Sequence, residues 1–139
     1  MNYTEKQIKL LNSIGITDLE NINWHKISSN QILSEIFIRE FKDNVDWYGI
    51  SLYQILSLDF IREFQDDVHW FEISKYQFLT EDFIREFQDK VNWHLISANQ
   101  TLSEDFIREF KDNVDWFIII TYQRLTKNFI NEFNVFKID

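Results

Sequence analysis

Tryptophan recurs in this chain at a fixed spacing of 23 residues. The residues between successive tryptophans follow one pattern, W-x-x-I-S-x-x-Q-x-L-[ST]-x-x-F-I-R-E-F-x-D-x-V-x. Self-similarity at such a period is typical of solenoids, in which each unit buries its apolar face only against its neighbours. The sequence therefore predicts a tandem array of identical units. The five tryptophans are Trp24, Trp47, Trp70, Trp93 and Trp116.

Five repeats follow from these tryptophans, and positions within a repeat are numbered here from its tryptophan. The fifth repeat departs from the pattern, with Ile120 replacing the serine, Asn131 the arginine and Lys137 the valine. We predict a single all-α domain, an α-solenoid of five two-helix repeats with diverged ends. Its parts are an N-terminal cap over 1–23, repeats over 24–46, 47–69, 70–92 and 93–115, and a C-terminal repeat or cap over 116–139.

Each repeat has the signals of two short helices. In the second repeat, Asp46 can cap a first helix from Trp47 to about Gln54, and Ser57 a second helix over about 58–68. Such a short first helix is expected to be partly 3₁₀. At 100° per residue, Trp, Ile, Ser and Gln of the first helix share one face, which predicts a buried side and a variable side. The equivalent capping residues are Asn23, Asn92, Asp115, Ser34, Thr80, Ser103 and Thr126.

The polar residues that recur have structural explanations. Glutamine at position 8 lies on the buried face, so we predict that it satisfies backbone or neighbouring-repeat groups, with ligand contact as the alternative. Arginine at position 16 is followed four residues later by aspartate, which predicts a surface ion pair; the alternative partner is a glutamate of a neighbouring repeat. Serine at position 5 suits a close helix contact, and no histidine recurs nearby to activate it. The predicted structural core thus adds Gln31, Gln54, Gln77, Gln100 and Gln123 to the five tryptophans.

Composition excludes several classes of partner. A net charge of −9 and a pI near 4.7, without a Lys/Arg stripe, argue against nucleic-acid binding. No apolar run approaches the ~20 residues of a membrane-spanning helix, and the charged N-terminus lacks the apolar stretch of a signal peptide. The absence of cysteine excludes disulfides and thiolate zinc sites. We expect a cytoplasmic protein that does not contact membranes.

Catalysis would require a break in the repeat symmetry, because an active site brings different groups together in a cleft. The pattern offers no such break. His25 and His94 occupy the same position three repeats apart, which is too far for a shared metal ion. Neither a phosphate-binding glycine loop nor a metalloprotease motif occurs. The sequence therefore predicts no enzymatic activity, no metal and no cofactor.

The residues that change between repeats lie on the outer side of the first helix. Repeat scaffolds usually bind other proteins through aromatic side chains that vary from repeat to repeat on a constant framework. The alternative explanation is that these solvent-exposed positions vary because nothing constrains them. Adjacent apolar residues in the terminal repeat also indicate a partner or a dimer seam, so a homo-oligomer is the alternative function. The candidate partner-binding residues are His25, Tyr48, Phe71, His94 and Phe117 at position 2, Ile118 at position 3, Leu52 and Lys75 at position 6, and Tyr53, Tyr76 and Tyr122 at position 7.

The full motif is most regular in the stretch from Ile73 to Phe87, ISKYQFLTEDFIREF, closed by Trp93. This stretch resembles the short tandem helical repeats encoded by mimivirus-like giant DNA viruses, and the resemblance covers residues 24 to about 133. Those repeat proteins carry no assigned enzymatic activity. The resemblance therefore implies a viral origin, and with it a protein-interaction role that could involve host proteins.

Overall fold

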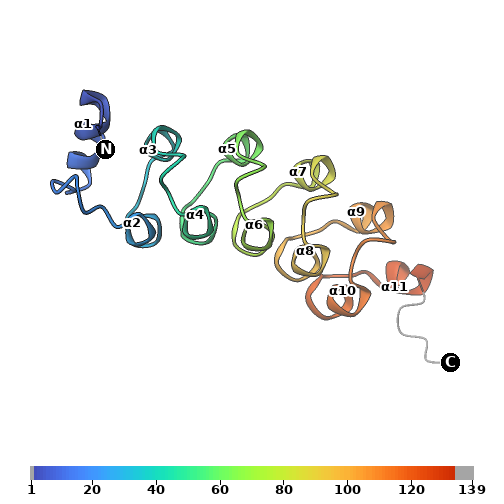
Figure 1. Cartoon of the computed structure of the whole chain (residues 1–139). Coiled ribbons are helices and arrows are strands. Elements are labelled where there is room, and N and C mark those ends of the chain that lie inside the picture. Colours follow the sequence, from blue (N-terminus) through green and yellow to red (C-terminus); the bar gives the residue numbers. More distant parts are fainter. Residues whose placement is uncertain (1, 134–139) are drawn as a thin grey trace. The chain divides into compact units, whose positions relative to one another are not determined.

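A computed structural model describes residues 2–133 of the 139-residue chain. Every regular element in this range is a helix, and within each of the two compact units described below successive helices alternate between two rows (Figure 1). The 23-residue period and the packing of neighbouring helices confirm the predicted α-solenoid fold class. The chain divides into two compact units, residues 1–69 and 70–139, and the division falls between the second and third repeats.

The two units contain the same kind of repeat. In the first, α2 packs against α4; in the second, α8 packs against α6 and α10. We call α2, α4, α6, α8 and α10 the first helices and their successors the second helices. The first unit contains α1 (Glu5–Ser13), α2 (Trp24–Asn30), α3 (Glu35–Glu40), α4 (Trp47–Tyr53) and α5 (Leu58–Glu63). The second contains α6 (Trp70–Tyr76), α7 (Glu81–Glu86), α8 (Trp93–Asn99), α9 (Glu104–Glu109), α10 (Trp116–Tyr122) and α11 (Lys127–Phe133).

The predicted caps of both helix types are confirmed. The Asp46 carboxylate accepts a hydrogen bond from the Tyr48 amide, and the Ser57 hydroxyl accepts one from the Phe60 amide. The first helices are α-helical throughout, so the expectation of partly 3₁₀ backbone was wrong. The second helix of this repeat ends at Glu63, five residues before the predicted Val68, and continues as a turn.

Two side chains that recur in every complete repeat end the second helix. In a longer α3, the Lys42 carbonyl would accept from the Asp46 amide. Instead, the Trp47 indole donates to the Lys42 carbonyl at 3.0 Å, and the Asp46 amide donates to the Ser28 hydroxyl at 2.9 Å. Because both backbone groups find side-chain partners, the helix can stop without leaving them unpaired. The same exchange recurs at Gln88, Asn92, Trp93 and Ser74, and at Lys111, Asp115, Trp116 and Ser97.

The core of each repeat is an aromatic cluster of one tryptophan and two phenylalanines. The Trp47 ring lies 5.0 Å from Phe64 and 6.3 Å from Phe60, and the two phenylalanine rings are 4.7 Å apart. Trp24, Trp70, Trp93 and Trp116 make the equivalent contacts at nearly the same distances. Equal spacing of the tryptophans therefore means equal surroundings, as the sequence pattern predicts.

The two ends of the chain differ from the complete repeats. Residues 2–23 contain one helix, α1, where a complete repeat has two helices. The Thr4 side chain caps its start, and a turn with Gly15 at φ 84° follows its end. The Lys6 ammonium pairs with Glu40 of α3 at 3.0 Å. At the other end, α11 closes the described chain, and the predicted substitution site Lys137 lies outside the described residues.

Candidate functional site

The recurring glutamine at position 8 links each repeat to the one before it. The Gln54 side-chain oxygen accepts from the Leu33 amide at 3.0 Å, and its nitrogen donates to the carbonyls of Ser28 and Gln31 at 2.9 and 2.7 Å. Gln100 and Gln123 each make the same three bonds to the repeat before their own. These contacts are those expected of a structural ladder, and they occupy the amides that a ligand would need.

The recurring serine at position 5 does more than provide a small contact. Ser51 and Ser97 are fully buried, and each hydroxyl donates to the carbonyl of its own tryptophan at 2.7 Å. Each also accepts from the amide of the residue before the next tryptophan, as at His69 and Asp115. The serine hydroxyls are therefore engaged in holding successive helices together.

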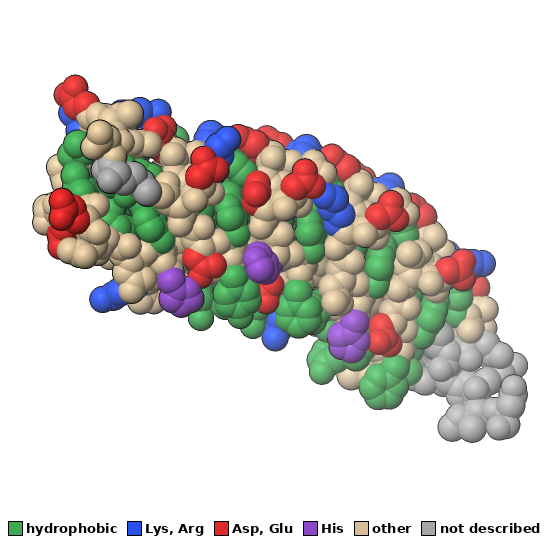
Figure 2. All heavy atoms as spheres, in the orientation of Figure 1, with side chains coloured by type: hydrophobic (Ala, Val, Ile, Leu, Met, Phe, Trp, Pro, Cys, Tyr) green, Lys and Arg blue, Asp and Glu red, His purple; other side chains and the backbone are tan. Residues whose placement is uncertain are grey.

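Exposed large hydrophobic side chains gather on the first helices and the connections that follow them. Of the ten such side chains in residues 2–133, nine lie at positions 2, 7 and 9 of their repeats, and Ile36 is the exception. Figure 2 shows hydrophobic side chains at the surface over the first helices and acidic ones over the second helices. We call positions 2, 6, 7 and 9 the first-helix face. The predicted candidates Tyr48, Tyr53, Phe71, Tyr76, Phe117 and Tyr122 are exposed on it.

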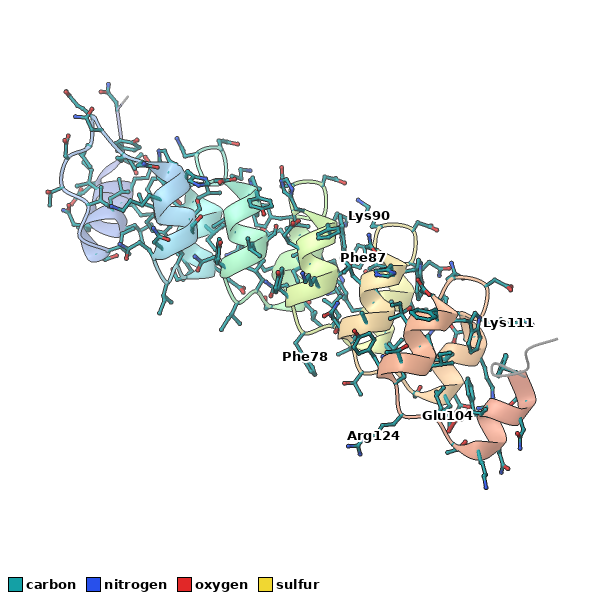
Figure 3. All side chains as sticks on the ribbon, turned by 90° about the horizontal axis from the view of Figure 1, so that it is seen from below. Phe78, Phe87, Lys90, Glu104, Lys111 and Arg124 are labelled. Carbon is teal, nitrogen blue, oxygen red and sulfur yellow. The ribbon has the colours of Figure 1, made fainter. Side chains whose placement is uncertain are left out.

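Position 9 is the part of this face that the sequence analysis missed. Ile32, Ile55 and Phe78 have 97%, 95% and 86% of their surface exposed. Figure 3 shows Phe78 and Arg124, which share this position, projecting outward from the connections after α6 and α10. The signal was present in the sequence, because in the first three repeats an apolar residue stands between the glutamine and the leucine of the pattern. Helical periodicity did not reveal it, since the helix ends two residues earlier, at position 7.

Three other predicted candidates are less accessible or already engaged. Ile118 is half-buried at position 3, where Gly49 of α4 faces Ser28 and Ser29 of the preceding repeat. The expected pair of adjacent exposed apolar residues therefore reduces to Phe117 alone, which is 73% exposed. Leu52 is half-buried as well, whereas Lys75 is exposed with its ammonium 5.1 Å from the Tyr76 ring.

The two candidate histidines contact the capping residue of the next first helix. His94 Nδ1 lies 2.9 Å from the Asp115 carboxylate, and His25 makes the same contact with Asp46. In the second repeat the corresponding positions hold Tyr48 and His69, whose rings meet edge to face at 5.6 Å. The hydrogen bond from His94, with help from the Ile118 amide, lowers the pKa of Asp115. Both histidines are exposed, so they border the first-helix face while serving a local contact.

The second helices carry the acidic charge and are tied together by it. Arg85 bonds Glu109 of the next repeat at 2.7 Å and Asp82 of its own helix at 2.6 Å. The predicted partner four residues on was therefore wrong for this arginine, and the alternative, a glutamate of a neighbouring repeat, is confirmed. Hydrogen bonding to arginine lowers the pKa of Glu109, and the Arg39 pair does the same to Glu63. Arg39 and Arg108 make the equivalent pairs with Glu63 and Glu132.

The first-helix face has the opposite electrostatic character. The first ten residues of the five repeats contain three bases, Lys26, Lys75 and Arg124, against one acid, Glu72. Within residues 2–133, no three His, Asp or Glu side chains come together as a metal-ligand set, and no helix is long and apolar enough to cross a membrane. The surface that remains is an apolar, weakly basic face on an acidic protein.

Comparisons with known proteins identify neither a family nor a function for this chain. No protein-family model, no curated protein and no solved structure matches this chain. The resemblance to giant-virus repeats stays a prediction.

Proposed function

We propose that this protein is a non-enzymatic repeat scaffold that binds another protein through its first-helix face. The observation that carries the proposal is the concentration of exposed large hydrophobic side chains at positions 2, 7 and 9. Isolated exposed hydrophobics are ordinary on soluble proteins, whereas their confinement to one face of a repeat is typical of binding surfaces.

The division of labour within a repeat supports the same proposal. Buried phenylalanines, serines and glutamines maintain the frame, so the residues at positions 2, 6, 7 and 9 can change without loss of the fold. Tyrosine and phenylalanine supply much of the contact energy in protein interfaces. A partner with an apolar contact surface and a few acidic residues suits the weakly basic face. If the chain is viral, host proteins in the cytoplasm are the first candidates.

A matched pair of variants tests the proposal. The face variant carries Tyr53→Ser, Tyr76→Ser and Tyr122→Ser, and the control carries Asp59→Ser, Asp82→Ser and Asp105→Ser on the exposed side of the second helices. We expect both to fold with the wild-type circular dichroism spectrum. A protein captured from host lysate, identified by mass spectrometry and purified, should bind wild type and control alike and lose at least about tenfold in affinity for the face variant. Equal binding to all three chains would contradict the proposal.

A further inference from the structure

The second unit carries a narrow row of exposed side chains at positions 7 and 9 of its repeats. Because α8 packs against both α6 and α10, three successive first helices present these positions side by side. Figure 3 shows Phe78 and Arg124 pointing to the same side of this unit. Positions 7 and 9 are two residues apart in the chain, so the row is at most about 7 Å wide. Its six residues, all exposed, are Tyr76, Phe78, Asn99, Thr101, Tyr122 and Arg124.

Each end of this row combines a tyrosine with a basic side chain. The Lys75 ammonium lies 5.1 Å from the Tyr76 ring, and Arg124 follows Tyr122 by two residues. Neither base forms an ion pair with another residue of 2–133, whereas the arginines of α7 and α9 pair with glutamates of the next repeat. The first ten residues of these three repeats contain one acid, Glu72, and it is buried. The row therefore favours a ligand with apolar groups and a carboxylate near each base.

The spacing of the first helices selects the form of this ligand. Helices that pack as neighbours lie about 8–10 Å apart, so the repeats of Lys75 and Arg124 are about 16–20 Å apart. A polyproline II chain covers this distance in about six residues and repeats its side-chain direction every three residues, or about 9 Å. One residue of such a chain faces each of the three helices, whereas in a β-strand the residue over α8 would point away. An α-helix with its side chains is about 10–12 Å wide, which exceeds the width of the row.

Given the proposed function, on which this inference rests, we propose that the partner contacts the second unit through an acidic polyproline II segment. The segment has two carboxylates about six residues apart, each near one of the two bases. Its prolines pack on the rings of Tyr76, Phe78 and Tyr122, since aromatic surfaces are the usual receptors of proline-rich peptides. The Thr101 hydroxyl in the middle of the row donates to a peptide carbonyl, because polyproline II leaves its backbone carbonyls without internal hydrogen bonds.

A pair of synthetic peptides tests the spacing of the carboxylates. The probe is fluorescein-labelled GDPPSPPDPG, with its aspartates six residues apart, and the control GPPDDSPPPG has the same composition with adjacent aspartates. Fluorescence anisotropy is measured at low ionic strength, where exposed charges are least screened. We expect a dissociation constant of about 0.1 mM for the probe and at least about tenfold weaker binding of the control. Equal affinity for the two peptides, or no binding of the probe at about 1 mM, would overturn the proposal.

Matched protein variants test whether the probe binds at the row. Lys75→Ser combined with Arg124→Ser should weaken binding of the probe by about tenfold, because both carboxylates lose their partners. The control combines Lys111→Ser with Lys127→Ser, which removes the same charge from exposed positions outside the row. All four side chains are exposed, so both variants should keep the wild-type circular dichroism spectrum. Equal weakening in the two variants would mean that only net charge matters, and would overturn the proposal.

Failure of the peptide experiment is distinguishable from failure of the proposed function. If the probe does not bind while the protein captured from lysate still loses affinity for the face variant, the polyproline II segment is ruled out and the proposed function stands. A partner that docks through a helix or a folded surface would give this result. If the captured protein binds the face variant as it binds wild type, the proposed function is contradicted, and the acidic segment with it.

Discussion

The first and second helices of a repeat differ in how much their sequences vary from one repeat to the next. Second helices repeat the sequence FIREF almost without change, and their phenylalanines and isoleucine are buried in every complete repeat. First helices keep only the residues that face the neighbouring repeat, and their outer side changes from repeat to repeat. The comparison shows that one half of the repeat provides the stability of the fold and the other half provides a variable surface.

The contacts explain this difference. A second helix packs its apolar stripe into its own repeat and reaches the next through Arg–Glu pairs, so few of its positions are free to vary. A first helix contributes to the fold through one tryptophan, one isoleucine, one serine and one glutamine. Positions 2 and 7 are exposed to solvent in every repeat, and substitution there costs little. Variation on that face is thus permitted by the fold, and whether a partner uses it is what the binding experiment decides.

The strongest test of this contrast compares two phenylalanines five residues apart. Phe83→Ala removes a ring that is 1% exposed and packs between Trp70 and Phe87, so we expect it to destabilise the fold by about 3–5 kcal/mol. Phe78→Ala removes a ring that is almost fully exposed and should change stability by less than about 0.5 kcal/mol. Urea unfolding followed by tryptophan fluorescence measures both. Similar losses of unfolding free energy in the two variants would contradict the proposed difference between the buried core and the exposed first-helix face.

An intermediate effect is expected at the glutamine ladder. Gln100→Leu leaves the Leu79 amide and the Ser74 and Gln77 carbonyls without their partner, which should cost about 2–4 kcal/mol. The matched control is Gln31→Leu, in which the same residue type has no preceding repeat to hold, with an expected change below about 0.5 kcal/mol. Measured at low protein concentration, equal changes in unfolding free energy would show that the glutamines do not link the repeats.

The smallest effect is expected from the ion pairs of the second helices. Because arginine lowers the pKa of Glu63 and Glu109 below the ordinary value of 4.5, their contribution to stability is complete at neutral pH. It is lost as the pH falls below about 4.5 and through the lowered pKa of the folded state. Glu109→Gln should therefore be less stable than wild type at neutral pH and show a shallower loss of melting temperature in acid. The control is Glu20→Gln, whose carboxylate forms no ion pair in the described chain, and a wild-type profile in Glu109→Gln would refute the assignment.

Much of the fold could be predicted because it depends on local rules. The capping residues, the buried stripe of the second helices and the buried glutamines Gln54, Gln77 and Gln100 follow from residue type and helical phase alone. The same rules place Gln31 in the core, and there they were wrong, because no two-helix repeat precedes it and its side chain is exposed. The partner of Arg85 could not be predicted in the same way. Asp89 is near in sequence and Glu109 is 24 residues away, and only the packing of neighbouring second helices brings Glu109 within reach. The exposed residues at position 9 were missed because they lie just beyond the helix, where helical phase no longer applies.

The sequence by itself determined the architecture, because a strict period with the same apolar residues in every repeat can bury those residues only by stacking equal helix pairs. The tertiary structure decided which polar group each recurring side chain meets. For example, the Trp47 indole donates to the Lys42 carbonyl, and the Ser28 hydroxyl accepts from the Asp46 amide. In a longer helix these two backbone groups would have been hydrogen-bonded to each other. The tertiary structure also decided which variable residues are accessible, because exposure depends on the helix that lies alongside and not on the period.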